Sequence, residues 1–211
     1  MSLSKMRHPL DGHLSMHVIA AIVFPARVIA AALLLAIAAP ASQAQSAQPF
    51  AVQLSALFTT IQTGSTRIAG SGVELQQRFN RLYADEDFGA VSLGVGAQFT
   101  VHTKAEDRLG IVGLFLEPRY VPPTSSGRFF PYVSARLAVQ RVSGEFQFAE
   151  GGSSFGTAYG AGGGFAVRIT RRTNFDVGVQ LIRQQYGEIG SVRLETFNTY
   201  TAKVGVSLGY R

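Results

Sequence analysis

The segment VSLGVGAQFTVH, residues 91–102, alternates apolar and polar side chains along its whole length. A period of two places every second side chain on the same face of a β-strand. The segment therefore predicts a strand with one apolar and one polar face, and it is longer than the usual globular strand of about 5–6 residues. The apolar face consists of Val91, Leu93, Val95, Ala97, Phe99 and Val101. The polar face consists of Ser92, Gly94, Gly96, Gln98, Thr100 and His102.

The same alternation recurs along the chain after residue 44, and no stretch has convincing helical periodicity. The predicted strands are 50–62, 71–81, 88–102, 109–121, 129–142, 155–169, 173–186 and 197–210. Turn signals separate them, such as Thr63-Gly64-Ser65, Pro122-Pro123 and Gly151-Gly152. Evenly spaced strands of this kind predict an all-β, eight-stranded antiparallel up-and-down barrel.

Alternation alone does not say which face lies inside. An outer-membrane barrel turns its apolar faces toward lipid, whereas a soluble lipocalin-like barrel in the periplasm turns them inward around an apolar ligand. Long strands suit a tilted membrane span of about 9–11 residues, and the polar faces carry Gly, Ser and Gln rather than many charges. Aromatic residues collect near strand ends, as two interfacial girdles require. One set is Phe50, Phe79, Tyr120, Phe129, Phe175 and Tyr210, and the other is Phe58, Phe99, Phe155, Tyr186 and Tyr200. These features favour a transmembrane barrel.

The N-terminal 44 residues have the pattern of a signal peptide. Residues 28–39 form an unbroken apolar stretch that follows Arg27 and ends before Pro40. This stretch is shorter than the roughly 20 residues of a membrane-spanning helix and suits the apolar core of a signal peptide. Ser42 and Ala44 put small residues at the −3 and −1 positions of a cleavage site after Ala44. We expect a cleaved signal peptide over 1–44 and a barrel over 45–211; an N-terminal membrane anchor is the alternative.

Composition narrows the classes of function. The chain of 211 residues contains no Cys, which excludes disulfides, thiolate metal sites and a Cys nucleophile. Charged residues make up 15% of the chain, against about 25% in ordinary soluble domains. The formal net charge is +6, but export and the dispersed distribution of the basic residues argue against nucleic acid as a partner.

The polar faces carry charges that a narrow barrel must bury. The predicted register sends eight of them inward: Glu74, Arg78, Glu117, Arg119, Arg136, Arg168, Asp176 and Lys203. Buried charges must be paired or hydrated, and we expect Glu117 to pair with Arg136 or Arg168. The surplus of cations leads us to expect water or a bound anion. The alternating Gly160, Gly162 and Gly164 would leave room for bulky inward side chains. A polar plug and an anion-selective or gated pore both remain open.

Enzymatic chemistry has little support in the sequence. After residue 44 the only histidine is His102, and the next residues, Thr103-Lys104, do not form the His-x-Ser-Asn pattern of lipid A deacylases. The acidic run Asp85-Glu86-Asp87 suggests a hydrated loop, and a calcium site would want more ligands at regular spacing. The Gly run is followed by no helix, as a phosphate-binding loop would require. We expect no enzyme activity, no metal and no cofactor.

Several segments carry a resemblance to a known family. They are FLEPRY at 115–120, PYVSAR at 131–136 and the Gly-rich strand at 160–164, together with the signal peptide. Residues 45–211 resemble the small bacterial outer-membrane β-barrels of the OmpA/OmpX-like type, the "outer membrane protein beta-barrel domain". The last strand resembles the family's assembly signal through Val204, Val206, Leu208 and Tyr210, although Arg211 follows where the aromatic residue is usually last.

This resemblance implies residence in the outer membrane after export, and contact with the outer-membrane assembly machinery. We expect a structural or surface-interaction role, in envelope integrity or adhesion, with four outer connections at about 63–70, 103–108, 143–154 and 187–196 available to a surface or host partner. Arg67, Lys104, Arg108 and Arg193 would then face lipopolysaccharide phosphates, or else be ordinary solvated charges. A narrow porin-like channel for ions or small solutes is the alternative function.

Overall fold

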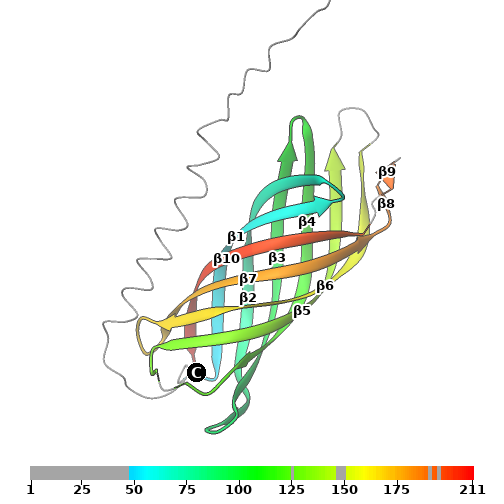
Figure 1. The fold of residues 1–211 in the computed structure, drawn as a ribbon. Coiled ribbons are helices and arrows are strands. Elements are labelled where there is room, and N and C mark those ends of the chain that lie inside the picture. Colours follow the sequence, from blue (N-terminus) through cyan, green and yellow to red (C-terminus); the bar gives the residue numbers. More distant parts are fainter. Residues whose placement is uncertain (1–47, 125, 146–150, 190–191, 194–195) are drawn as a thin grey trace, which may run out of the picture. The chain divides into compact units, whose positions relative to one another are not determined.

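The computed structural model describes residues 48–124, 126–145, 151–189, 192–193 and 196–211. Eight long strands form a closed antiparallel barrel in which each strand pairs with the next and β1 pairs with β10 (Figure 1). The strands are β1 (Phe50–Thr63), β2 (Thr66–Asp85), β3 (Gly89–Lys104), β4 (Asp107–Val121), β5 (Phe129–Glu145), β6 (Gly152–Arg168), β7 (Thr173–Tyr186) and β10 (Phe197–Tyr210). Between β7 and β10, the short strands β8 (Glu188–Ile189) and β9 (Val192–Arg193) form a separate hairpin. The fold prediction is confirmed.

We call the end with the connections after β1, β3, β5 and β7 the outer end, and the end with the two chain termini of the barrel the inner end. Strands β2, β4 and β6 begin earlier than predicted, so the three outer connections predicted before them shrink. Thr63 pairs with Thr66 across Gly64, which adopts the left-handed φ of 56° that a tight turn requires. Lys104 pairs with Asp107. The connections predicted at 63–70 and 103–108 are therefore mostly strand.

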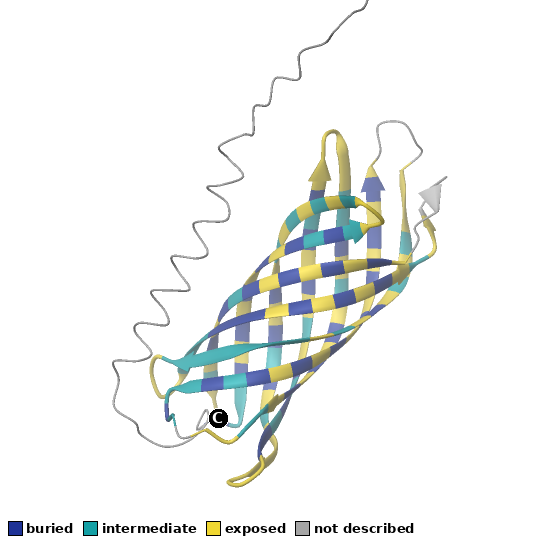
Figure 2. Cartoon of the chain, viewed as in Figure 1, coloured by how far each residue is buried: buried dark blue, intermediate teal, exposed yellow. Residues whose placement is uncertain are grey.

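The apolar faces of the strands point outward. Figure 2 shows exposed and buried residues alternating along the strands. In β3, the side chains of Ser92, Gln98 and Thr100 are buried, whereas those of Val95 and Phe99 are exposed. The exterior carries a continuous set of exposed large apolar residues that includes Leu54, Leu114, Leu137 and Val179. The alternative of an apolar ligand cavity inside a soluble barrel is therefore wrong.

The strands are staggered around the barrel. Following register partners once round from Arg141 leads back to the same strand at Pro131. This stagger means that the strands tilt against the barrel axis. It also brings residues from distant parts of the sequence to the same depth inside the barrel. None of the described residues forms a helix that is long and apolar enough to cross a membrane.

Candidate functional site

Seven of the eight charged side chains that the sequence places inside the barrel form a single bonded network there. Each of the seven is at most 6% exposed: Glu74, Arg78, Glu117, Arg119, Arg136, Asp176 and Lys203. They come from β2, β4, β5, β7 and β10, where alternation turns them inward. The network contains three carboxylates and four cations, so it carries one excess positive charge.

Glu117 lies at the centre of this network and accepts from four cations. Its carboxylate is bonded by Arg78 Nη2 at 3.0 Å, Lys203 Nζ at 3.0 Å and Arg119 Nη2 at 3.3 Å. Arg136 donates to it through Nε at 3.1 Å and also through Nη2. Gln180 Nε2 adds a neutral donor at 2.8 Å. One fully buried carboxylate therefore organises donors from five strands.

The second carboxylate, Glu74, shares two of these cations. Arg136 Nη2 lies 2.5 Å from Glu74 Oε2, and Lys203 Nζ lies 3.5 Å from Oε1. Arg136 also donates to Gln98 Oε1 at 2.8 Å, and its guanidinium lies 3.9 Å from the centre of the Phe115 ring. Arg136 and Lys203 thus balance the charges of Glu74 and Glu117.

Asp176 anchors the part of the network nearest the inner end. It accepts from Arg119 Nη1 at 2.6 Å and from the Tyr132 hydroxyl at 2.9 Å. The Arg119 guanidinium lies 3.6 Å from the centre of the Tyr132 ring. A Cβ on Gly178 would lie 2.5 Å from the Tyr132 hydroxyl oxygen, and one on Gly164 would lie 2.8 Å from it. Glycines on the inward face therefore leave the space that Tyr132 needs to reach Asp176.

The structure does not bring Arg168 into this network. Arg168 is the last residue of β6, at the inner end, and its guanidinium lies 4.9 Å from the centre of the Phe130 ring. The alternation predicted correctly that Arg168 belongs to the inward face of β6. Arg168 nevertheless lies too near the inner end to reach Glu117. Of the two partners expected for Glu117, the structure places Arg136 against it and not Arg168.

The outer end of the interior contains an apolar cluster that sequence reasoning missed. Four buried side chains, Ile61, Ile111, Val142 and Phe197, pack across the barrel. Ile68, Leu109 and Tyr186 pack against them. The predicted place of Tyr186 in the outer aromatic girdle is wrong, because its hydroxyl points inward. Asp176 also lies on the inward face of β7, an even number of residues from Tyr186. This spacing was the signal that could have predicted an inward side chain for Tyr186.

A layer of paired polar side chains lies beneath this apolar cluster. Thr59 Oγ1 and His102 Nε2 are 2.7 Å apart. Gln184 Nε2 donates to Thr199 Oγ1 at 2.7 Å, and the Tyr186 hydroxyl bonds Gln184 Oε1 at 2.6 Å and Gln140 Oε1 at 2.7 Å. Among the described residues, no group of three or more His, Asp or Glu side chains could hold a metal ion.

The basic residues predicted to meet lipopolysaccharide lie at the outer end, but in strands rather than loops. Arg67, Lys104 and Arg108 are exposed on β2, β3 and β4, and Arg193 belongs to β9. Sequence reasoning missed two further exposed arginines near this end, Arg141 on β5 and Arg183 on β7. Arg141 Nη2 donates to Ser153 Oγ at 2.9 Å, and its guanidinium lies 5.9 Å from the centre of the Phe155 ring.

The side chains of the predicted assembly signal lie on the outer face of β10. Val206, Leu208 and Tyr210 are 42%, 58% and 44% exposed, and Val204 is half-buried. The ring of Tyr210 stacks on Phe50 at 5.8 Å, and Phe50 meets Phe79 edge-on at 5.9 Å. The predicted signal peptide, residues 1–44, lies outside the described residues.

Comparison with known proteins shows the fold. No protein-family model matches the chain, and no curated protein does. The crystal structure of Neisserial surface protein A (NspA) matches with a TM-score of 0.61 at 18% identity, over 77% of this chain and 97% of that one. Ail, the attachment invasion locus protein of Yersinia pestis, matches with a TM-score of 0.50 at 12% identity, over 76% and 97%. A second Ail structure, in complex with the heparin analogue sucrose octasulfate, matches with a TM-score of 0.51 at 10% identity, over 76% and 97%. The chain therefore has the fold of the small outer-membrane β-barrels, an eight-stranded up-and-down transmembrane barrel.

Proposed function

We propose that the protein is a bacterial outer-membrane barrel with a closed lumen, and that its role is structural or surface-interacting, in envelope integrity or adhesion. The observation that carries this proposal is the combination of an apolar exterior with an interior that is crossed by packed side chains.

The exterior supports residence in a membrane. Exposed aliphatic side chains cover the barrel wall, with Leu114 at 69% and Val139 at 62% exposed. Monomeric soluble proteins rarely expose apolar patches larger than a few hundred Å². Exposed aromatic residues lie toward both ends, such as Tyr120 and Tyr210 toward the inner end and Phe99 and Tyr200 toward the outer end. This is the distribution expected of aromatic girdles at the two interfaces.

The interior supports a lumen that does not conduct. An eight-stranded barrel is just wide enough for side chains to fill it. Here an ion would have to pass both the charge network around Glu117 and the apolar cluster at Ile61, Ile111, Val142 and Phe197. The apolar cluster offers no polar group to replace an ion's hydration shell.

A barrel with a closed lumen contacts its partners through the residues exposed at its ends. Figure 1 shows the β3–β4 hairpin and the outer ends of β5 and β6 rising beyond the β1–β2 turn. The exposed basic residues Arg67, Lys104, Arg108, Arg141 and Arg183 lie toward this end. Guanidinium groups bind phosphate with two parallel hydrogen bonds, which favours lipopolysaccharide as a contact of this rim.

The first test is location and migration. The chain is expressed with residues 1–44 in a Gram-negative host, the outer membrane is isolated, and the extract is run boiled and unboiled in detergent gels. We expect a faster unboiled band, and an N-terminus at Gln45 after export. A water-soluble protein with no mobility shift would contradict the proposal.

The second test is conductance. Protein whose fast unboiled migration shows that it is folded is added to planar lipid bilayers. It is extracted again afterwards to confirm that it stayed folded. We expect no stepwise current. Reproducible current steps would instead favour the narrow porin-like channel.

Lipopolysaccharide contact is tested with matched arginine variants. Arg67→Gln and Arg108→Gln are combined at the outer end, and Arg171→Gln with Arg172→Gln at the inner turn serves as the control. We expect lipopolysaccharide to stabilise the wild-type barrel and the control in mixed micelles, but to stabilise the outer variant less. Equal stabilisation of all three would remove this partner from the proposal.

A further inference from the structure

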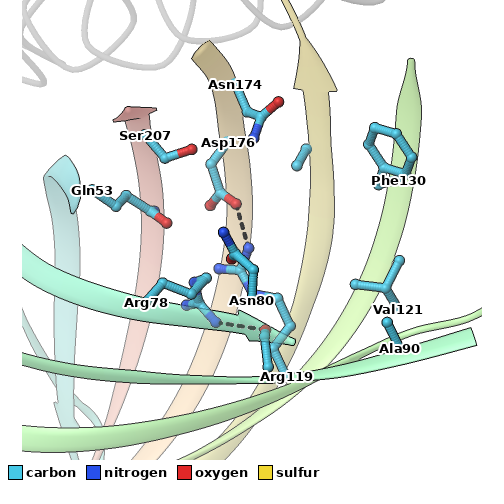
Figure 3. Close-up of a pocket in the computed structure, with 12 residues that line it drawn as sticks. Gln53, Arg78, Asn80, Ala90, Arg119, Val121, Phe130, Asn174, Asp176 and Ser207 are labelled. Atoms are coloured by element: carbon cyan, nitrogen blue, oxygen red, sulfur yellow. Dashed lines mark hydrogen bonds and ion pairs between the residues drawn. The ribbon is translucent and has the colours of Figure 1, made fainter. Parts of the chain in front are cut away.

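The inner end of the barrel contains a partly open cavity of about 70 Å³ on the inner side of the charge network. Figure 3 shows side chains from different strands around this space, among them Gln53, Arg78, Asn80 and Asp176. Phe130, Val121 and Ala90 lie on the other side in this view, and Ala166 also lines the cavity. Since one water needs about 10–15 Å³ of such space, the cavity has room for several waters or one small solute.

Two arginines in the cavity wall have a donor that no other described group satisfies. The Nε atoms of Arg78 and Arg119 are buried and have no hydrogen-bond partner, although the side chains are only 4% and 6% exposed. Each Nη atom makes at least one hydrogen bond, those of Arg78 to Ser92, Gln76 and Glu117 and those of Arg119 to Asp176 and Glu117, and these contacts leave one Nη–H of Arg78 and two of Arg119 unused. Buried donors of charged groups are rarely left without an acceptor, so the two guanidinium groups that line the cavity have donors to offer to a ligand.

The charge balance of the network places its excess positive charge beside the same cavity. Farther from the inner end, Arg136 and Lys203 face Glu74 and Glu117, which is two cations against two carboxylates. At the cavity, Arg78 and Arg119 share Glu117 with those two cations, and Asp176 is the one further carboxylate of the network beside them. The network's single excess positive charge therefore lies beside the cavity, where one monovalent anion would neutralise it.

We propose that this cavity binds a small oxyanion, of the size of acetate or phosphate, between Arg78 and Arg119. The anion's oxygens accept from N–H groups of the Arg78 and Arg119 guanidiniums that line the cavity, and the amide and hydroxyl groups of Gln53, Asn174 and Ser207 lie within the same wall. A carboxylate with a short alkyl group would set that group against Phe130. Asp176 in the wall limits the site to anions of low charge.

The test measures unfolding of the folded barrel in zwitterionic detergent as acetate or inorganic phosphate is added. Ionic strength is held constant with a bulky sulfonate that the cavity cannot admit. At about five times its dissociation constant, a bound anion multiplies the folded-to-unfolded ratio about sixfold and raises the midpoint by about 2–4 °C. A saturable rise of this kind supports the site, and a response equal to that of the bulky sulfonate overturns it.

Two variant pairs separate the cavity from a general salt effect. Gln53→Glu supplies a carboxylate of nearly the same shape in the wall, so the response to added anion should disappear; Gln184→Glu, in the polar layer toward the outer end, should keep it. Ala166→Leu fills the cavity without touching a charge, whereas Ala161→Leu makes the same change on the exposed face of β6. If added anion still stabilises both the Gln53→Glu and the Ala166→Leu variants, the proposal is overturned, even if one of these variants is less stable than the wild type.

Discussion

The inner half of the barrel interior carries seven charged side chains, whereas its outer end carries an apolar cluster of four. Both regions are built by strands of the same alternating pattern, and both fill the same narrow cross-section. They differ in what each side chain requires of its neighbours. A buried charge needs specific partners at hydrogen-bond distance, while an apolar side chain needs only volume and contact.

This difference predicts different responses to mutation. In the charged region, the loss of one group leaves several others without a partner, because Glu117 alone serves four cations. In the apolar cluster, the loss of a methyl group leaves a small void that neighbours such as Ile68 and Leu109 can partly fill. Substitutions that keep the shape of the side chain test this contrast directly.

Glu117→Gln should have the largest effect. It keeps the size of the side chain but removes the charge that holds Arg78, Arg119, Arg136 and Lys203 together. Removing one partner of a buried ion pair costs about 3–5 kcal/mol, so the midpoint of unfolding in detergent should fall sharply. Glu106→Gln, in the exposed β3–β4 turn, is the matched control and should change little. An unchanged midpoint for Glu117→Gln would remove this ion cluster as a source of stability.

Thr59→Val should have a smaller effect. It replaces the hydroxyl that lies 2.7 Å from His102 Nε2 with a methyl group, and leaves that ring nitrogen buried without its partner. An unsatisfied buried polar group costs about 1–3 kcal/mol. Thr60→Val, which lies on the lipid side of the same strand, should be neutral or slightly stabilising. Equal midpoints for the two variants would show that the Thr59–His102 contact contributes nothing.

The alternation of residues 91–102 predicted the fold because one face of each strand must meet lipid and the other must not. The same rule gave the inward face of Glu74, Glu117 and Lys203. It could not give their contacts, since Lys203 reaches Glu74 only after the barrel closes between β1 and β10. Even spacing predicted that the barrel closes, but it does not give the register in which β1 pairs with β10.

The alternation also could not predict how deep in the barrel each inward side chain lies. Arg168 has the correct face, but tilt and register place it beside Phe130 at the inner end. Ile61, Ile111 and Val142 lie on the inward faces, whose other residues are mostly polar. Because the alternation predicted these faces to be polar, it did not predict an apolar cluster on them. They form a cluster only because the stagger of the strands brings them to one level.

Ile111→Val tests the apolar cluster itself. Ile111 is 1% exposed, and removing one methyl group from a packed site costs about 0.5–1.5 kcal/mol. The cost should be clearly below that of Glu117→Gln, as the contrast between the two regions requires. Ile169→Val removes the same methyl group at a residue that is 61% exposed and should be silent. Urea-induced unfolding in detergent can resolve the difference between these two variants.

Among the four main variants, Arg141→Gln should have the smallest effect, and it extends the comparison to the outer face of the barrel. Arg141 and Arg136 belong to the same strand, but Arg136 is buried against two carboxylates, whereas Arg141 is exposed and bonded to Ser153. A guanidinium over an exposed aromatic ring contributes about 0.5–1 kcal/mol, and Ser153→Ala, which keeps the contact with Phe155, should cost less than Arg141→Gln. If Arg141→Gln destabilised the barrel as much as Arg136→Gln does, position on the inner or outer face would not decide what a charge contributes.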